Sequence, residues 1–123
     1  MPDGIILMKT ATCKTYSVKI WMAGDICWAR DICRQFCRHN PLCVTVTACD
    51  YIYPYGEESG FVVGLINYPK FPSTPHELTT LAEYLAECLM DGLCQKAYTI
   101  QSDNGTQWVS KEDEIEQTNR RRA

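Results

Sequence analysis

The feature that most constrains the fold is a change of hydrophobic period near residue 24. Residues 15–23 (TYSVKIWMA) alternate, with Tyr16, Val18, Ile20 and Met22 on one face and Ser17, Lys19 and Trp21 on the other. This pattern predicts a half-buried strand. Gly24 and Asp25 follow, and residues 26–38 (ICWARDICRQFCR) carry apolar side chains at helical spacing, with Asp25 as the N-cap. The folded part of the chain therefore begins with a strand and then a helix, which ends at Asn40-Pro41.

The same two periods recur in the middle of the chain. Residues 42–53 (LCVTVTACDYIY) are rich in β-branched and aromatic side chains and predict a second strand. We expect residues 54–60 to form a loop and residues 61–68 (FVVGLINY) to return as a third strand. Thr74-Pro75-His76-Glu77 is a capping box, which predicts a helix from residue 75 to about Met90.

Strand signals return towards the C-terminus. Residues 95–102 predict a fourth strand, Asp103-Asn104-Gly105 predicts a hairpin turn, and residues 107–109 an optional short edge strand. The order β-α-β-β-α-β predicts an α+β, ferredoxin-like fold, in which two helices cover one face of a four-stranded antiparallel sheet. We expect residues 1–14 to be a flexible extension, residues 15–110 the single domain and residues 111–123 a charged tail.

Composition excludes several classes of protein. The 123 residues suit one domain, and the net charge of −3 with a pI near 5.3 argues against a general nucleic-acid binder. No apolar run approaches the ~20 residues that span a bilayer. Eight cysteines are present without a C-x-x-C motif, so we interpret them as free, buried thiols in a reducing cytoplasm. Disulfides and metal binding are the alternatives; we expect no metal and no cofactor.

The predicted sheet has one face that the helices leave open. Trp21 lies on that face, and the second strand adds Tyr51 and Tyr53 if its Val44 side faces the helices. Tryptophan and tyrosine are favoured anchors in interfaces. Three interpretations compete: a second copy or the C-terminal segment covers this face, a protein partner binds it, or it stacks RNA bases.

Acidic and aromatic residues are concentrated at the end of the second strand and just beyond it. Residues 50–95 carry seven acidic side chains and one lysine. A cluster of carboxylates and tyrosines suits a basic target. The predicted partner-binding residues are Asp50, Tyr51, Tyr53, Tyr55, Glu57 and Glu58, with Trp21 as a second anchor.

Signals for catalysis are few. The two histidines, His39 and His76, lie at helix ends, and the chain has no nucleophile elbow, P-loop or dinucleotide motif. Glu57 and Glu58 are adjacent, and adjacent side chains in an extended segment point apart. We therefore expect no catalytic residue and no enzyme activity.

Three stretches carry a resemblance to known proteins. They are residues 22–25 with 33–37, residues 42–47 (LCVTVT) and residues 63–72 (VGLINYPKFP). Together they resemble small uncharacterised bacteriophage and prophage proteins, a group that includes anti-CRISPR and other anti-defence inhibitors. The resemblance implies a phage-encoded inhibitor that acts in the cytoplasm of an infected bacterial host.

The resulting prediction is a non-catalytic, protein-binding inhibitor of a host defence complex, for example a CRISPR–Cas effector. It would block a basic nucleic-acid-binding or docking surface, without binding specific nucleic acid or a membrane itself. The alternative is a homodimeric module that binds a small ligand. A small cysteine- or histidine-dependent enzyme is a third hypothesis.

Overall fold

A computed structural model describes residue 4 and residues 6–111 of the chain. Seven elements follow one another in the order β-α-β-β-α-β-β. They are β1 (Ser17–Ala23), α1 (Ile26–His39), β2 (Val44–Tyr53), β3 (Gly56–Ile66), α2 (Pro75–Gly92), β4 (Ala97–Ser102) and β5 (Gly105–Ser110). The predicted α+β class is confirmed, with five strands in the sheet where four and an optional fifth were expected.

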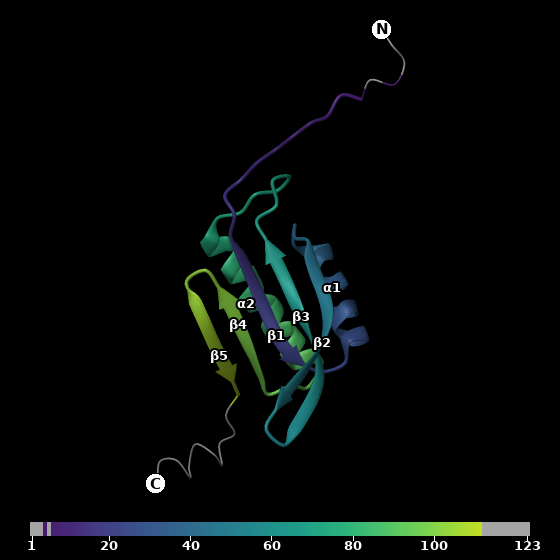
Figure 1. Ribbon diagram of the computed structural model, residues 1–123, viewed down its shortest axis with the longest axis vertical. Helices are drawn as coiled ribbons and strands as arrows, with labels where there is room; N and C mark the ends of the chain where they lie inside the picture. Colours follow the sequence, from purple (N-terminus) through teal and green to yellow (C-terminus); the bar gives the residue numbers. More distant parts are fainter. Residues whose placement is uncertain (1–3, 5, 112–123) are drawn as a thin grey trace.

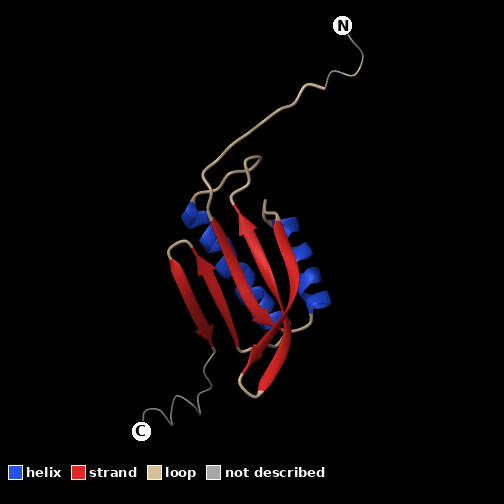
Figure 2. Ribbon diagram, viewed as in Figure 1, coloured by secondary structure: helices blue, strands red, loops and turns tan. Residues whose placement is uncertain are grey.

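The five strands form one antiparallel sheet in the order β2-β3-β1-β4-β5. Strand β1 lies in the centre, between β3 and β4, and β2 and β5 are the edges. Both helices cover the same face of this sheet, and residues 4 and 6–111 place no helix on the other face (Figures 1 and 2). The molecule therefore has two layers, and the second face of the sheet is open.

Alternation along the strands determines which side chains enter the core. On β1, Val18, Ile20 and Met22 are buried against the helices, while Lys19 points to the open face. The rest of the core comes from the helix-facing side chains of β3 and β4 and from the inner faces of the helices. Its largest fully buried members are Phe61, Leu65, Leu78, Leu85 and Leu89. Two layers thus share one core, as the sequence pattern predicts.

Both helices begin as their caps predict. The Asp25 carboxylate accepts hydrogen bonds from the backbone N–H groups of Cys27 and Trp28, and the Thr74 hydroxyl accepts one from Glu77. These bonds satisfy N–H groups that have no partner within a helix. Helix α2 runs to Gly92, two residues beyond the predicted end. Neither helix among the described residues is long and apolar enough to cross a membrane.

The main difference from the sequence prediction lies between residues 53 and 61. The predicted loop over residues 54–60 is wrong: β2 and β3 continue as one long hairpin whose turn is only Pro54-Tyr55. Tyr55 takes a left-handed backbone conformation, with φ of +68°. The hairpin end projects beyond the helices (Figure 1).

The ends of the chain are only partly described. Residues 6–14 form no helix or strand and extend away from the sheet, as Figure 1 shows. Residue 14 contacts the domain through Asn67, whose side-chain amide donates a hydrogen bond to the Lys14 carbonyl at 2.8 Å. Most of the predicted tail, residues 112–123, lies outside the described residues, as do residues 1–3 and 5 of the predicted extension.

Candidate functional site on the open face of the sheet

Strand pairing places two tryptophans in one row on the open face. Trp21 on β1 pairs with Thr99 on β4, and Thr99 pairs with Trp108 on β5. Neighbouring strands lie about 4.8 Å apart, so the two tryptophan backbones are roughly 10 Å apart across Thr99. A flat ring in contact on both sides needs about 7–8 Å. The spacing of the two backbones therefore exceeds what one flat ring needs.

The Trp21 indole is fixed by its neighbours on the sheet. Its Nε1–H donates to Gln101 Oε1 at 3.0 Å, and Lys19 Nζ lies 5.9 Å from the ring centroid. The hydrogen bond satisfies the polar end of the ring, and the ammonium–ring contact is within cation–π range. Trp21 is thus a partly exposed aromatic surface with a defined orientation.

The end of the β2–β3 hairpin adds two tyrosines and a carboxylate to the same face. The Tyr51 hydroxyl donates to the Phe61 carbonyl at 2.7 Å, and the Tyr53 hydroxyl donates to Glu58 Oε1 at 3.2 Å. The rings lie against glycine positions of the partner strand: a Cβ at Gly56 would come within 2.6 Å of the Tyr53 ring, and one at Gly60 within 2.5 Å of the Tyr51 ring. Because glycine has no side chain, Gly56 and Gly60 leave room for the two tyrosine rings to lie on the strand.

Both tyrosines stay protonated at neutral pH. Burial and a side-chain hydrogen bond with Cys49 raise the pKa of Tyr51. Burial, together with the hydrogen bond to Glu58 and its negative charge, raises the pKa of Tyr53. Neutral phenols donate hydrogen bonds and are not general bases. In this part of the face, Glu58 is the group able to compensate a positive charge on a ligand.

These side chains surround a hollow of about 420 Å³, within the range of about 300–1,000 Å³ typical of small-molecule sites. It collects residues from each of the five strands of the sheet and from the segment before β4. The side chains that matter for binding are Trp21, Tyr51, Tyr53, Glu58, Lys96, Thr99 and Trp108. The hollow thus combines aromatic walls with one carboxylate and one ammonium group; we call it the open-face hollow.

Four of the seven predicted site residues line the open-face hollow: Trp21, Tyr51, Tyr53 and Glu58. The other three do not. Asp50 and Glu57 alternate with hollow residues along their strands and so point to the other side of the hairpin. Tyr55 lies in the turn and is fully exposed.

Sequence reasoning missed Trp108 and Lys96. The signal for Trp108 was the turn at Asp103-Asn104, because a hairpin there returns residues 105–110 beside β4 and places Trp108 opposite Thr99. Lys96 precedes β4 and gave no signal in the sequence.

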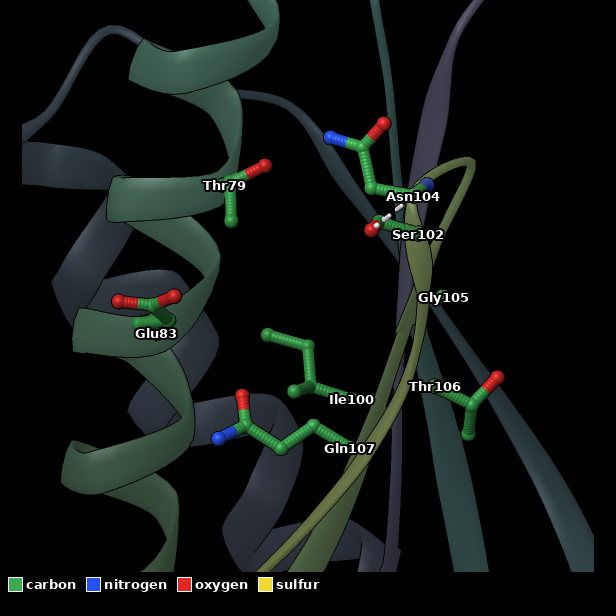
Figure 3. Close-up of a pocket in the computed structure, with 8 residues that line it drawn as sticks. All are labelled: Thr79, Glu83, Ile100, Ser102, Asn104, Gly105, Thr106 and Gln107. Atoms are coloured by element: carbon green, nitrogen blue, oxygen red, sulfur yellow. Dashed lines mark hydrogen bonds between the residues drawn. The ribbon is translucent and has the colours of Figure 1, made fainter.

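A second hollow, of about 280 Å³, lies on the helix side, between α2 and the β4–β5 hairpin (Figure 3). Thr79 and Glu83 from α2 face Asn104 and Gln107 across it, and Ile100 points into the space between them. It is smaller than the typical range and has no aromatic wall. Most of its lining residues carry polar side chains.

The cysteines are free thiols, but the expectation that they are buried holds fully for Cys33 alone, since Cys27, Cys43, Cys88 and Cys94 are exposed. Cys33 is buried, and burial raises its pKa to about 12. Within residues 4 and 6–111, no group of three or more His, Cys, Asp or Glu side chains could hold a metal ion. His39 lines a hollow between the helices rather than the open-face hollow.

Comparisons with known proteins give a match in fold alone. No protein-family model and no curated protein sequence matches the chain. Among solved structures, a phage SAM lyase in its apo state matches with a TM-score of 0.64 and 11% identity, over 88% of this chain and 98% of that chain. A phage SAM lyase in complex with S-methyl-5'-thioadenosine matches with a TM-score of 0.58 and 11% identity, over 87% and 98%.

These matches correct the functional prediction. The proteins that share the fold come from phages, which agrees with the resemblance to phage-encoded proteins. They are enzymes, however, and this overturns both the prediction of a non-catalytic protein-binding inhibitor and the prediction of no enzyme activity. Nothing in the fold or the matches points to an anti-CRISPR protein. The predicted host partner with a basic surface and the alternative homodimer stay predictions.

Proposed function

We propose that this protein is a lyase that binds S-adenosylmethionine in the open-face hollow and releases S-methyl-5'-thioadenosine. The observation that carries the proposal is the combination of two tryptophans and a carboxylate in one hollow, on a fold shared with a phage SAM lyase. The fold alone would not identify a substrate, because one fold supports many functions. The residues of the hollow supply the second argument.

The proposed reaction follows from the structures of substrate and product. S-adenosylmethionine has a sulfonium that carries a methyl group, an adenosyl group and an aminobutyrate chain. S-methyl-5'-thioadenosine keeps the first two, so the bond that breaks joins sulfur to Cγ of the aminobutyrate chain. The electron pair returns to sulfur, which becomes a neutral sulfide. If the carboxylate of the same chain closes on Cγ, the other product is a lactone and no further reactant is needed.

Adenine is the part of the substrate that the tryptophans fit. A purine is a flat ring, and stacking of a base on an aromatic side chain is worth about 1–3 kcal/mol. We place it above Thr99, between Trp21 and Trp108. The sulfonium would then lie towards the tyrosines at the end of the β2–β3 hairpin.

Glu58 and Lys96 fit the charged groups of the aminobutyrate chain. A carboxylate paired with the sulfonium would stabilise the substrate more than the transition state, in which that positive charge disappears, and would slow the reaction. The α-ammonium keeps its charge throughout, so we assign Glu58 to the α-ammonium, with Tyr53 holding the carboxylate in place. Lys96 is the cation available to hold the substrate carboxylate on binding; the carboxylate must leave Lys96 before it closes on Cγ, because its charge also disappears in the transition state.

Two finer features belong to the same proposal. We infer that the core is ferredoxin-like, with β5 added at one edge, since the order β2-β3-β1-β4 and its antiparallel pairing are those of the split βαβ arrangement. We also place the protein in the cytoplasm of an infected bacterium, because its fold is shared with phage proteins.

Turnover of S-adenosylmethionine by the purified protein tests the proposal, with S-methyl-5'-thioadenosine measured by liquid chromatography and mass spectrometry. Trp108→Ala removes one stacking partner and should raise the KM about 5- to 150-fold, the equivalent of about 1–3 kcal/mol. Trp28→Ala is the matched control, because Trp28 is similarly exposed (64% against 69%) but lies on α1. No product from the wild-type protein, or equal loss in both variants, would refute the proposal.

A further inference from the structure

A third hollow, of about 460 Å³, lies on the helix side of the sheet, at the end opposite the β4–β5 hairpin. It is a groove between α1 and the edge strand β2, with Leu42 and Cys43 at one end. Its lining consists of Arg30, Cys33, Arg34, Cys37, Leu42, Cys43, Val44 and Val46. None of the residues assigned above to the open-face hollow lines this groove.

The floor of the groove is apolar and only partly covered. Val44 and Val46 point to the helix side of β2, but they keep partial exposure because β2 is an edge strand and α1 is the helix that packs on it. Together with Leu42 they leave an apolar strip open to solvent. Apolar surface at the bottom of a hollow is typical of ligand-binding grooves.

The thiols continue this apolar surface. Cys33 and Cys37 lie one helical turn apart on the face of α1 that meets β2. Burial raises the pKa of both thiols, that of Cys33 to about 12, so both are uncharged at neutral pH. A protonated cysteine packs as a small apolar side chain.

The rim of the groove is positively charged. Arg30 and Arg34 occupy consecutive turns of α1, and no carboxylate is among the lining residues. Arg34 pairs with Asp31, and both partners are exposed to solvent. Arg30 has no carboxylate within 4 Å among residues 4 and 6–111. Among the described residues, the Arg30 guanidinium thus lacks a carboxylate partner, and such planar groups bind carboxylates well.

We propose that this groove binds a medium-chain fatty acid, with the acyl chain on Leu42, Val44 and Val46 and the carboxylate at Arg30. An apolar strip that ends at a guanidinium matches the two parts of such a molecule. A purely apolar ligand would make no ion pair with Arg30, and a polyanion would make no contact with the apolar strip. This site is independent of the proposed lyase activity, and each can fail without the other.

The cysteines of the chain provide a direct test of where a fatty acid binds. Cys43 lies in the groove and is exposed, whereas Cys27 and Cys94 are exposed elsewhere. We would titrate the full-length protein with decanoate, below its micelle concentration, and measure iodoacetamide labelling of each cysteine by mass spectrometry. Decanoate should slow labelling of Cys43 in a saturable way and leave Cys27 and Cys94 unchanged.

Two variants separate the charge from the apolar strip. Arg30→Gln should weaken protection of Cys43 by decanoate about tenfold. Arg38→Gln is the matched control, because Arg38 lies on the same helix outside the groove and should have no effect. Val46→Phe places a ring over the strip and should reduce protection with the arginines intact; a circular dichroism melt checks that each variant is folded.

Related probes test whether the groove needs both the acyl chain and the carboxylate. Butyrate has the carboxylate without the chain, and decanol has the chain without the charge, so neither should protect Cys43 at the decanoate concentration. Anionic lipid vesicles also present acyl chains next to negative charges, so they test whether the groove binds a membrane surface; they should not protect Cys43. Equal protection by decanol, protection by vesicles in place of decanoate, or no protection at all would overturn the proposal.

Discussion

Glu58→Gln is the substitution that examines most closely how the open-face hollow would recognise its substrate. Glu58 lies on the open face of β3, paired across the hairpin with Tyr51, and its carboxylate accepts a hydrogen bond from the Tyr53 hydroxyl. A glutamine keeps the size of the side chain and an oxygen that can accept this bond. The change therefore removes the negative charge and leaves the local geometry in place.

The expected effect follows from the exposure of the site. Two opposite charges 4 Å apart attract by about 1 kcal/mol in bulk water and by about 4 kcal/mol at the effective dielectric near a protein surface. Competing water and side-chain ordering reduce this value at partly exposed sites. We expect a loss of about 1–2 kcal/mol in binding of S-adenosylmethionine, which is a rise of roughly 5- to 30-fold in Kd.

The matched control is Glu57→Gln, which removes the same charge from the next residue. Glu57 points to the other face of the hairpin, opposite Ile52, so its effect should stay within about twofold. The proposed reaction would consume S-adenosylmethionine during a titration, so isothermal titration calorimetry at low ionic strength uses an uncleavable analogue that keeps the aminobutyrate chain. Thermal melts check that both variants are folded. The reasoning is refuted if both variants weaken binding equally or if Glu58→Gln binds as well as the wild type.

Three further predictions concern the fold. Gly60→Ala should lower the free energy of unfolding by about 2 kcal/mol or more, because the added Cβ would lie 2.4 Å from the backbone oxygen of Met22 on β1. Gly64→Ala should lower it less, because the added Cβ would meet only the Thr45 hydroxyl, which can rotate away. Urea titrations measure both variants. Thr74→Ala should cost about 1 kcal/mol, because it removes the N-cap of α2, and an unchanged urea midpoint would contradict this. The free energy of unfolding should fall as the pH rises from 9 towards 12, because the Cys33 thiol keeps its proton in the folded state and loses it in the unfolded state. Cys33→Ala should make the free energy of unfolding depend less on pH in this range. The same pH dependence in the variant and the wild type would contradict the prediction.

The elements that the sequence predicted well are those with local causes. Side chains of β1 alternate because the strand has one buried and one open face, and the two helices begin where Asp25 and Thr74 can cap them. These signals lie within a few residues of the structure that they determine. They were sufficient to order six of the seven elements and to place Trp21 on the open face.

The start of β3 could not be predicted for a physical reason. Residues 56–60 (GEESG) have low strand propensity and are typical of a loop. They form a strand because the Tyr51 and Tyr53 rings occupy the space above Gly56 and Gly60 on the neighbouring strand. That contact joins residues on both sides of the turn and is visible only once the register of the hairpin is known.

The open-face hollow was harder to predict than the start of β3, because it depends on the pairing of strands that are far apart in the sequence. Trp21 and Trp108 are 87 positions apart in the chain, and they come together because β4 lies between β1 and β5. No short motif marks such a site. The acidic aromatic segment was recognised, but its role was assigned to a protein partner because the sequence did not show that the tryptophans and the hairpin form one hollow.

A crystal structure of the protein with S-methyl-5'-thioadenosine tests the central claim most directly. We predict that the adenine lies above Thr99, in contact with Trp21 and Trp108, and that the thioether points towards Tyr53. Adenine bound in the polar hollow between α2 and the β4–β5 hairpin, or no bound nucleoside at saturating concentration, would contradict the assignment of the site to the open face of the sheet.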